Sequence, residues 1–189
     1  MPVFVLLASY LIGCFPTAYF AGRLLKGRDI RRLGDGNVGA ANAYRELGSL
    51  AGAGVFLLDI VKGMVVIGLS RALDVSPVIV LWSGVMAVLG HSFPVFLHFR
   101  GGRGVATAIG ALIATLGWPA VIATTVGISC LPLFKRVTPA SAVGFVLLPV
   151  LCWAYGYSWG MVFYSVCLPV QVGLTHYLRV HAPRALRPA

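Results

Sequence analysis

Two glycine-rich segments carry the polar residues whose types and spacing suit the binding of an anion. GDGNVGAANAYR covers residues 34–45, and RGGRG covers residues 100–104. Glycines allow successive backbone N–H groups to turn toward one anion, and a helix that starts near Ala40 would direct its positive end the same way. Because Asn42 and Arg45 are three residues apart, they would share a face of that helix. By itself, the first segment is also compatible with a solvated loop.

The second segment repeats this combination of flexible backbone donors and a cation beside a helix start. Gly101, Gly102 and Gly104 surround Arg103, and an apolar run follows directly. Its arginines also fit a simpler interpretation as signals of membrane topology. Two such segments on one face of the protein favour a site for a phosphate-bearing ligand at the membrane surface.

Residues 34–39 also match the G-x-G-x-x-G fingerprint of dinucleotide-binding proteins. That fingerprint is meaningful only between a strand and a helix of a βαβ unit. Here an apolar run and a basic segment precede it, so we reject a dinucleotide-binding fold. The glycine backbone of this segment can still bind a phosphate without such a fold.

The acidic residues exclude several kinds of chemistry. Only five occur, and all lie in the first 74 residues: Asp29, Asp35, Glu46, Asp59 and Asp74. A paired carboxylate or a carboxylate-rich metal cage therefore cannot come from the second half of the chain. The sequence predicts no metal site and no cofactor.

The elements that position these segments are expected to lie in a bilayer. The 189 residues are 59% hydrophobic with a mean hydropathy of +0.90, more apolar surface than a soluble domain of this size can hide. Apolar runs near the length of a membrane span recur along the chain. The predicted fold is all-α, a polytopic membrane protein with one domain over residues 1–189. The seven expected spans cover roughly residues 3–22, 53–70, 77–98, 104–117, 118–134, 139–156 and 158–178.

Basic residues follow every second span and predict the orientation. They are Arg23, Lys26, Arg28, Arg31 and Arg32, then Arg100 and Arg103, then Lys135 and Arg136, and finally Arg179, Arg184 and Arg187. The positive-inside tendency places all of them in the cytoplasm, with the N-terminus outside and the C-terminus cytoplasmic. Residues 104–134 must then cross twice or form a re-entrant hairpin. The net charge of +10 accordingly reflects orientation and an anionic ligand, and no nucleic acid is expected.

Charged and titratable residues within the spans are the remaining candidates. Asp59 and Lys62 lie three residues apart, a spacing that allows a neutralising pair at a depth where single charges are costly. A structural pair and a role in supporting the site are both compatible with it. His91 is expected to be a packing histidine near the cytoplasmic end of its span. His176 ends the last span on the same side as both glycine-rich segments.

Longer stretches around these residues resemble the motifs of one family. GDGNVGAAN, with Arg45 after it, is similar to a family motif GSGNVGATN that is also followed by arginine. Residues 59–63 match D-x-x-K-G, and GHSFPVFLHFRGGRGVAT at residues 90–107 is similar to a GH-x-aromatic-PVF run that leads into KGGKGVAT. The family is that of the bacterial acyl-phosphate-dependent glycerol-3-phosphate acyltransferases, small membrane enzymes of phospholipid synthesis. The resemblance covers nearly the whole chain.

This resemblance implies transfer of an acyl chain from acyl phosphate to the 1-hydroxyl of glycerol-3-phosphate, in the bacterial cytoplasmic membrane. It implies lysophosphatidate and inorganic phosphate as products. The implied catalytic residues are Asp35, Arg45, Arg103 and His176. The implied substrate-binding residues are Gly36, Asn37, Gly39, Asn42, Gly101, Gly102, Gly104 and a hydroxyl from Thr138 or Ser141.

The chain also departs from the family pattern. Asp35 stands in the place of a serine and Arg103 in the place of a lysine, and the segment after His176 lacks the usual asparagine and glutamate. An ionised Asp35 only accepts hydrogen bonds, so it either points away from the phosphates or binds the glycerol hydroxyl as a general base. Two alternatives to an enzyme stay open: a non-catalytic or regulatory relative that binds phosphate-bearing lipids, and a transporter of a small anion.

Overall fold

The computed structural model describes residues 1–181, and the predicted basic positions Arg184 and Arg187 lie outside this range. All regular elements within it are helices, as the composition predicts. They are α1 (Pro2–Gly13), α2 (Thr17–Lys26), η1 (Ile30–Arg32), α3 (Ala40–Leu47), α4 (Ser49–Ala72), α5 (Pro77–Ser92), η2 (Val95–Leu97), α6 (Val105–Leu116), α7 (Trp118–Ser129), α8 (Leu131–Phe134), α9 (Val137–Ala154) and α10 (Trp159–His181). The predicted fold class, an all-helical polytopic membrane protein, is confirmed.

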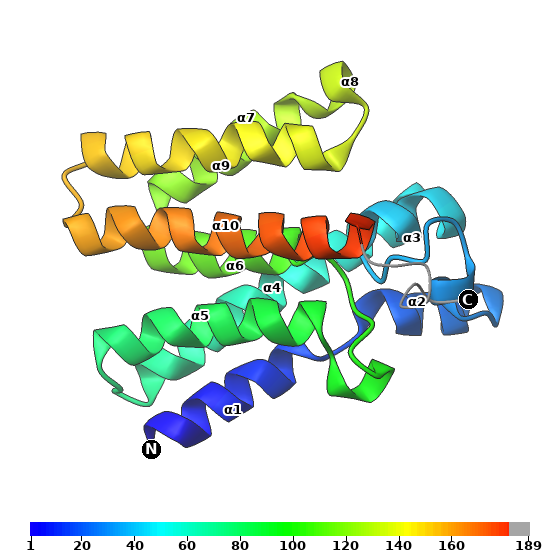
Figure 1. Cartoon of the computed structure of the whole chain (residues 1–189), viewed down its shortest axis with the longest axis horizontal. Coiled ribbons are helices and arrows are strands. Elements are labelled where there is room, and N and C mark those ends of the chain that lie inside the picture. Colours follow the sequence, from blue (N-terminus) through cyan, green and yellow to red (C-terminus); the bar gives the residue numbers. More distant parts are fainter. Residues whose placement is uncertain (182–189) are drawn as a thin grey trace.

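The long helices run side by side and form one bundle (Figure 1). α1 packs on α5, α4 on α6, and α7 on α9, and α10 lies against α5, α6 and α9. Small residues permit the closest of these approaches, as is usual for helices in membranes. A Cβ atom on Gly63 would overlap the Thr107 carbonyl oxygen of α6, and one on Gly144 would overlap the Ala123 carbonyl oxygen of α7.

The first span differs from its prediction because it is two helices rather than one. The chain breaks between α1 and α2 at Pro16, which has no N–H for the helical hydrogen-bond ladder. The break exposes the Phe15 carbonyl oxygen, which accepts a hydrogen bond from Lys62 Nζ at 3.1 Å. Thr17, the first residue of α2, donates to Asp59 Oδ1 at 2.9 Å. The interruption therefore supplies two polar partners to charges inside the bundle.

Five stretches are long and apolar enough to cross a membrane, and two further apolar helices are shorter. The five are Pro2–Lys26, Ser49–Ala72, Pro77–Leu97, Val137–Ala154 and Trp159–Arg179, and the shorter ones are Val105–Leu116 and Trp118–Phe134. The break at residues 117–119 is confirmed, because Gly117 takes a φ of +60° between α6 and α7. The full count of seven crossings stays a prediction.

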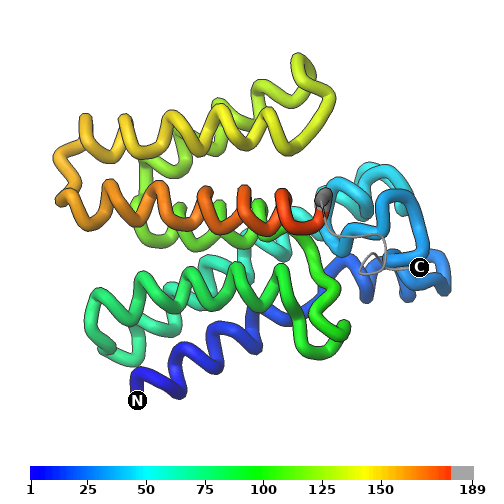
Figure 2. Tube along the Cα trace, viewed as in Figure 1, coloured from blue at the N-terminus to red at the C-terminus, as the bar shows by residue number. Residues whose placement is uncertain are grey.

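The 12-residue helix α6 is only about 18 Å long at 1.5 Å per residue. Its C-terminal end is tied to the end of the bundle where α4 and α9 finish. There Arg71 donates to the Ala114 carbonyl oxygen at 2.8 Å, and the Tyr157 hydroxyl donates to the Leu116 carbonyl oxygen at 2.7 Å. α6 is therefore shorter than a membrane span at its other, N-terminal end. There the loop between α5 and α6 enters the bundle beside α10 (Figure 2).

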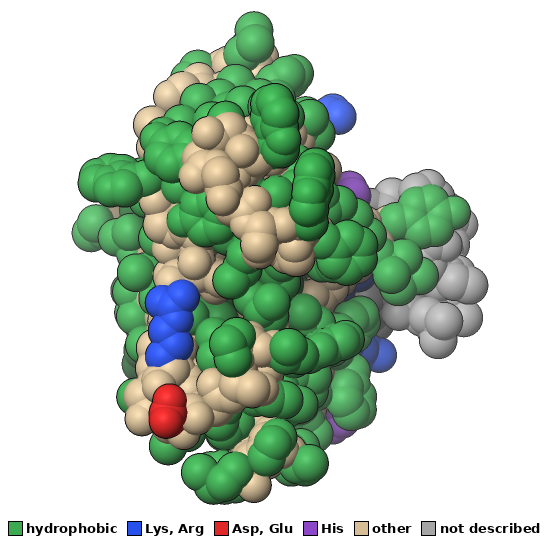
Figure 3. All heavy atoms as spheres, turned by 90° about the vertical axis from the view of Figure 1, so that its left-hand side faces the viewer, with side chains coloured by type: hydrophobic (Ala, Val, Ile, Leu, Met, Phe, Trp, Pro, Cys, Tyr) green, Lys and Arg blue, Asp and Glu red, His purple; other side chains and the backbone are tan. Residues whose placement is uncertain are grey.

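Charge is distributed unequally between the two ends of the bundle. Both glycine-rich segments, the start of α9 and the C-terminal end of α10 meet at one end, where they surround a common cavity. The opposite end is covered mainly by hydrophobic side chains and shows few charged ones (Figure 3). This distribution fits the cytoplasmic placement that the sequence predicts for the basic residues.

Candidate functional site

A cavity of about 1,100 Å³ opens between α3, α4, α6, α7 and α9 at the charged end of the bundle. Several residues predicted for the site line it: Asn37, Gly39, Arg45, Arg103, Gly104, Thr138, Ser141 and His176. The deeper wall is apolar and includes Leu112, Ala120, Ala123, Phe145 and Leu148. A ligand with an anionic head and an apolar chain matches this division between mouth and interior.

Three helices begin at this cavity. The first residues of α3, α6 and α9 belong to its lining: Gly39, Ala40 and Ala41, then Gly104, Val105 and Ala106, then Arg136, Val137 and Thr138. No side chain caps any of these helix starts. Each N-terminus carries unsatisfied backbone N–H groups and roughly half a positive charge. Their convergence provides donors and potential for more than one phosphate group.

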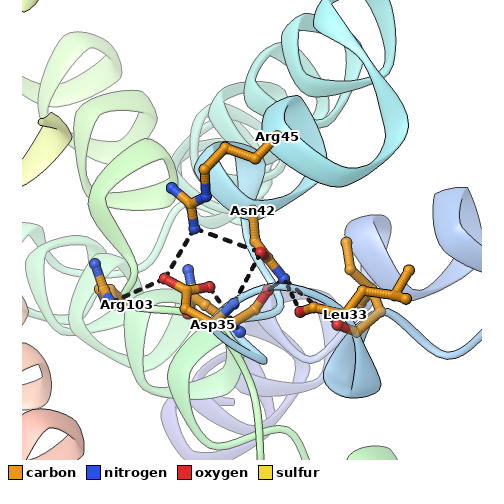
Figure 4. A network of polar contacts seen from close by, with 7 residues as sticks. Leu33, Asp35, Asn42, Arg45 and Arg103 are labelled. Atoms are coloured by element: carbon orange, nitrogen blue, oxygen red, sulfur yellow. Dashed lines mark hydrogen bonds and ion pairs between the residues drawn. The ribbon is translucent and has the colours of Figure 1, made fainter. Parts of the chain in front are cut away.

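Asp35 joins the two predicted arginines in an ion cluster at the exposed rim of the cavity (Figure 4). One oxygen, Asp35 Oδ2, lies 2.9 Å from Arg45 Nη2 and 3.4 Å from Arg103 Nη2. The three side chains come from the first glycine-rich segment, from α3 and from the second segment, and each is partly exposed. Asp35 itself does not belong to the lining. The carboxylate therefore holds both guanidinium groups at the mouth without entering the cavity.

Asn42 is fully buried and organises the first glycine-rich segment (Figure 4). Its amide nitrogen donates to the carbonyl oxygens of Leu33 at 3.0 Å and Asn37 at 3.1 Å. Its amide oxygen accepts from the Asp35 backbone N–H at 3.3 Å and from Arg45 Nη2 at 3.4 Å. Asn42 and Arg45 thus share one face of α3, as predicted. The Asn42 side chain forms its hydrogen bonds with other groups of the protein.

The remaining predicted residues divide between the lining and its support. Gly36, with a φ of +71°, and the buried Gly101 and Gly102 shape the two segments without lining the cavity. Gly104, the N-cap of α6, takes a φ of +85°, in the left-handed region that favours glycine. Asn37 Oδ1 is buried and has no hydrogen-bond partner among the described residues, so this oxygen remains for a ligand.

A second cluster of charges lies inside the bundle, under the second glycine-rich segment. Lys62 Nζ lies 2.9 Å from Asp59 Oδ1 and 3.1 Å from His91 Nδ1. All three side chains are buried, and Asp59 and His91 also line the cavity. The predicted pair of Asp59 and Lys62 is confirmed, and His91 is a polar partner of that pair rather than only a packing residue.

The loop that leads to the first segment contains its own ion pair. Arg31 contacts Asp29 with an Nη2 to Oδ2 distance of 2.6 Å and also donates to the Leu97 carbonyl oxygen at 3.4 Å. The hydrogen bonds that Arg31 donates to the Asp29 carboxylate hold the pKa of Asp29 below its ordinary value. The same hydrogen bonds raise the pKa of Arg31. The pair thereby ties η1 to the loop after α5.

Sequence reasoning missed two cations that line the cavity and a third at the same end of the bundle. Lys135 and Arg136 line the cavity, although their spacing indicated only topology. Arg179, three residues after His176, donates to the Ser92 carbonyl oxygen and lies 5.6 Å from the centre of the Phe93 ring. The signal that could have found Arg179 was its place on the same helix face as His176. Within residues 1–181, no group of three or more His, Cys, Asp or Glu residues is arranged to hold a metal ion.

Comparisons with known proteins agree with this arrangement. Residues 3–182 match the family model described as "Glycerol-3-phosphate acyltransferase". Glycerol-3-phosphate acyltransferase 4 of Dehalococcoides mccartyi is 49% identical over 179 residues, which cover 95% of this chain and 97% of that protein. Glycerol-3-phosphate acyltransferase 2 of Moorella thermoacetica is 38% identical over 165 residues, covering 87% and 84%.

Solved structures show the same architecture. The crystal structure of PlsY (YgiH), an integral membrane glycerol 3-phosphate acyltransferase, in its glycerol 3-phosphate form superposes with a TM-score of 0.82 at 28% identity. The match covers 100% of this chain and 94% of that one. Fold and site thus define an integral membrane protein of the acyltransferase class. The chain belongs to the glycerol-3-phosphate acyltransferase family, as its motifs predicted.

Proposed function

We propose that this protein transfers an acyl chain from acyl phosphate to the 1-hydroxyl of glycerol-3-phosphate and releases lysophosphatidate and inorganic phosphate. The observation that carries the proposal is the meeting of three uncapped helix N-termini with Arg45 and Arg103 at the mouth of a cavity whose depth is apolar. Both proposed substrates bear a phosphate, and one bears an apolar chain. The charged mouth of the cavity suits the phosphates, and its apolar interior suits the acyl chain.

The reaction requires little covalent chemistry from the protein. The glycerol oxygen forms an ester bond with the acyl carbon, and the bond between that carbon and the phosphate oxygen breaks. The leaving phosphate carries the electron pair away, and a substrate phosphate can accept the hydroxyl proton. The protein then acts by orienting the partners and by stabilising negative charge through N–H donors and guanidinium groups.

Arg45 and Arg103 are the proposed phosphate ligands, supported by the backbone of Gly39 and Gly104. An arginine has five N–H donors, and the contacts with Asp35 and Asn42 use only part of them. His176 and the hydroxyls of Thr138 and Ser141 line the same cavity and are proposed to contact substrate.

Asp35 is proposed to be a counter-ion that positions the two arginines. The sequence left open whether Asp35 points away from the phosphates or binds the glycerol hydroxyl, and its place at the rim, outside the cavity lining, supports the first of these. A carboxylate in that place holds the guanidinium groups close together while no substrate is bound. It also lowers the positive potential that the substrate phosphates encounter.

The site is proposed to face the cytoplasm of a bacterial inner membrane, with the N-terminus outside. The basic residues Arg45, Arg103, Lys135 and Arg136 line the cavity at the site end, whereas the opposite end shows few charged side chains (Figure 3), and this contrast supports the orientation. A water-soluble glycerol-3-phosphate would then reach the cavity from the cytoplasm, and the acyl chain would reach it from the bilayer.

The test uses purified protein with palmitoyl phosphate and labelled glycerol-3-phosphate. Formation of labelled lysophosphatidate is expected, and an Arg45→Ala variant is expected to lose it. The proposal fails if no product forms with acyl phosphates of several chain lengths. Anion flux into liposomes that contain the protein and no acyl donor would instead support a transporter.

A further inference from the structure

The buried cluster of Lys62, Asp59 and His91 has a defined pattern of hydrogen bonds. A charged lysine has three N–H donors and no acceptor. Lys62 Nζ has three acceptors within reach: Asp59 Oδ1 at 2.9 Å, the Phe15 carbonyl oxygen at 3.1 Å and His91 Nδ1 at 3.1 Å. All three donors are thus used, and His91 Nδ1 must accept. The network therefore assigns the ring proton of a neutral His91 to Nε2.

The other edge of the His91 ring meets the second glycine-rich segment. A Cβ atom on Gly102 would overlap His91 Nε2 and would also come within 2.7 Å of the Val38 carbonyl oxygen. The imidazole therefore occupies the space that a side chain at position 102 would need. Since Val38 belongs to the first glycine-rich segment, Nε2 lies where the two segments meet.

The backbone of His91 holds the same segment. Its carbonyl oxygen accepts a hydrogen bond from the Gly102 N–H at 3.1 Å, and the Ser92 carbonyl oxygen accepts one from the Gly101 N–H at 3.2 Å. Arg103 follows directly, and Gly104 is the N-cap of α6. Any shift of Gly102 therefore moves both a guanidinium group and a helix N-terminus at the cavity mouth.

We propose that His91 is a positioning residue, which sets the spacing between the two glycine-rich segments and is itself oriented by Lys62 and Asp59. Lys62 fixes the ring from the Nδ1 side, and the Nε2 edge fixes Gly102 against Val38. The spacing so defined separates the N-termini of α3 and α6, which line one cavity. This inference rests on the proposed function, because it assigns that spacing to the binding of substrate phosphate.

A double-mutant cycle between His91→Asn and Gly102→Ala tests the inference. An asparagine retains an acceptor for Lys62 but is too short to reach Gly102. Each single variant is expected to raise KM for glycerol-3-phosphate by about tenfold, with a smaller change in kcat, because a displaced segment weakens phosphate binding. In the double variant the alanine at position 102 meets less crowding. The fold increase in KM is therefore expected to be at least threefold smaller than the product of the fold increases in the two single variants. A fold increase equal to that product would overturn the inference.

Gly101→Ala is the matched control. A Cβ atom there would overlap the backbone carbonyl oxygen of His91, which His91→Asn retains. Its effect on KM is therefore expected to multiply with that of His91→Asn. If His91→Asn reduced the effect of Gly101→Ala on KM as much as it reduces that of Gly102→Ala, the asparagine would merely loosen the loop. That result would contradict a role of the ring.

A second variant covers the case in which His91→Asn does not fold. The amide of His91→Gln can reach the Nε2 position, so this variant is expected to keep KM within about threefold of wild type. A rise of tenfold or more would contradict the inference. A shift of the unfolding temperature with glycerol-3-phosphate measures binding without turnover. Wild-type protein with neither this shift nor product would refute the proposed function, whereas an active wild type with an additive cycle would refute only the role of His91.

Discussion

The Asp35 carboxylate lies 2.9 Å from the Arg45 guanidinium, and the same oxygen reaches Arg103 at 3.4 Å. One residue thus connects the two glycine-rich segments at the mouth of the cavity. A serine at this position would leave both arginines without a counter-ion. Asp35 therefore neutralises part of the positive charge of the site before a phosphate binds.

The two arginines are expected to differ in their tolerance of lysine. Arg45 contacts both Asp35 Oδ2 and Asn42 Oδ1 through one nitrogen, Nη2, which leaves its other N–H groups for a phosphate, whereas the Asp35 contact of Arg103 is a single long one. A lysine has only one nitrogen and cannot keep both contacts while it binds a phosphate through a second nitrogen, so Arg45→Lys is expected to raise KM for glycerol-3-phosphate about tenfold and Arg103→Lys at most about threefold. Steady-state kinetics of the two variants provides the comparison. Equal effects would contradict the distinct roles.

Asn42 is expected to act through the fold of its segment. In Asn42→Asp, an oxygen replaces the amide nitrogen that now donates to Leu33 and Asn37, and the unfolding free energy should fall by about 1–3 kcal/mol. Thermal unfolding in detergent measures this loss. Asn37→Ala is the control, because Asn37 lines the cavity, and it is expected to raise KM with little change in stability. Equal destabilisation by both variants would contradict the assignment.

The buried pair of Asp59 and Lys62 predicts strong coupling. Asp59→Asn or Lys62→Met alone leaves one buried charge unpaired, and each is expected to cost about 3–5 kcal/mol of stability. The double variant is expected to lose less than the sum, since neither charge remains. Unfolding temperatures of the four proteins form the cycle. Additive losses would show that the two charges do not stabilise each other.

The pair of Asp29 and Arg31 predicts a dependence on acid. Because the folded pKa of Asp29 lies below its ordinary value of 3.8, its stabilising contribution is complete above that pH. The contribution is lost as the pH falls through the folded pKa. Asp29→Asn should therefore be less stable than wild type at pH 7, and the difference should shrink below about pH 4. A difference that is constant from pH 7 to pH 3 would contradict the ion pair.

Hydrophobic runs and breakers predicted most of the fold. Gly117 and Pro119 ended one helix and began the next, and the turn at residues 155–158 separated α9 from α10 as expected. The interruption at Pro16 was missed, because a proline inside an apolar run does not by itself decide between a break and a continuous helix. Pro149 and Pro169 lie within α9 and α10, which continue through them. The break at Pro16 frees the Phe15 carbonyl oxygen for Lys62, and this contact between residues 47 positions apart could not be predicted locally.

The site was predictable where its chemistry was local. Glycines beside arginines indicated helix starts, and the spacing of Asp59 and Lys62 indicated an ion pair. The meeting of Asp35 with Arg103 was not predictable, because residues 68 positions apart are brought together only by the packing of α4 on α6. Asn42 carries the same lesson, since its type suggested a ligand contact and only burial shows that its amide is used within the loop.

The most direct test of the central claim is the steady-state kinetics of Asp35→Ser with glycerol-3-phosphate as the varied substrate. If Asp35 is a counter-ion, removal of its charge strengthens the potential at the mouth, and KM should fall about three- to tenfold with kcat within about threefold of wild type. If Asp35 is instead the general base, kcat should fall by about 100-fold or more at an unchanged KM. That second result would contradict the account.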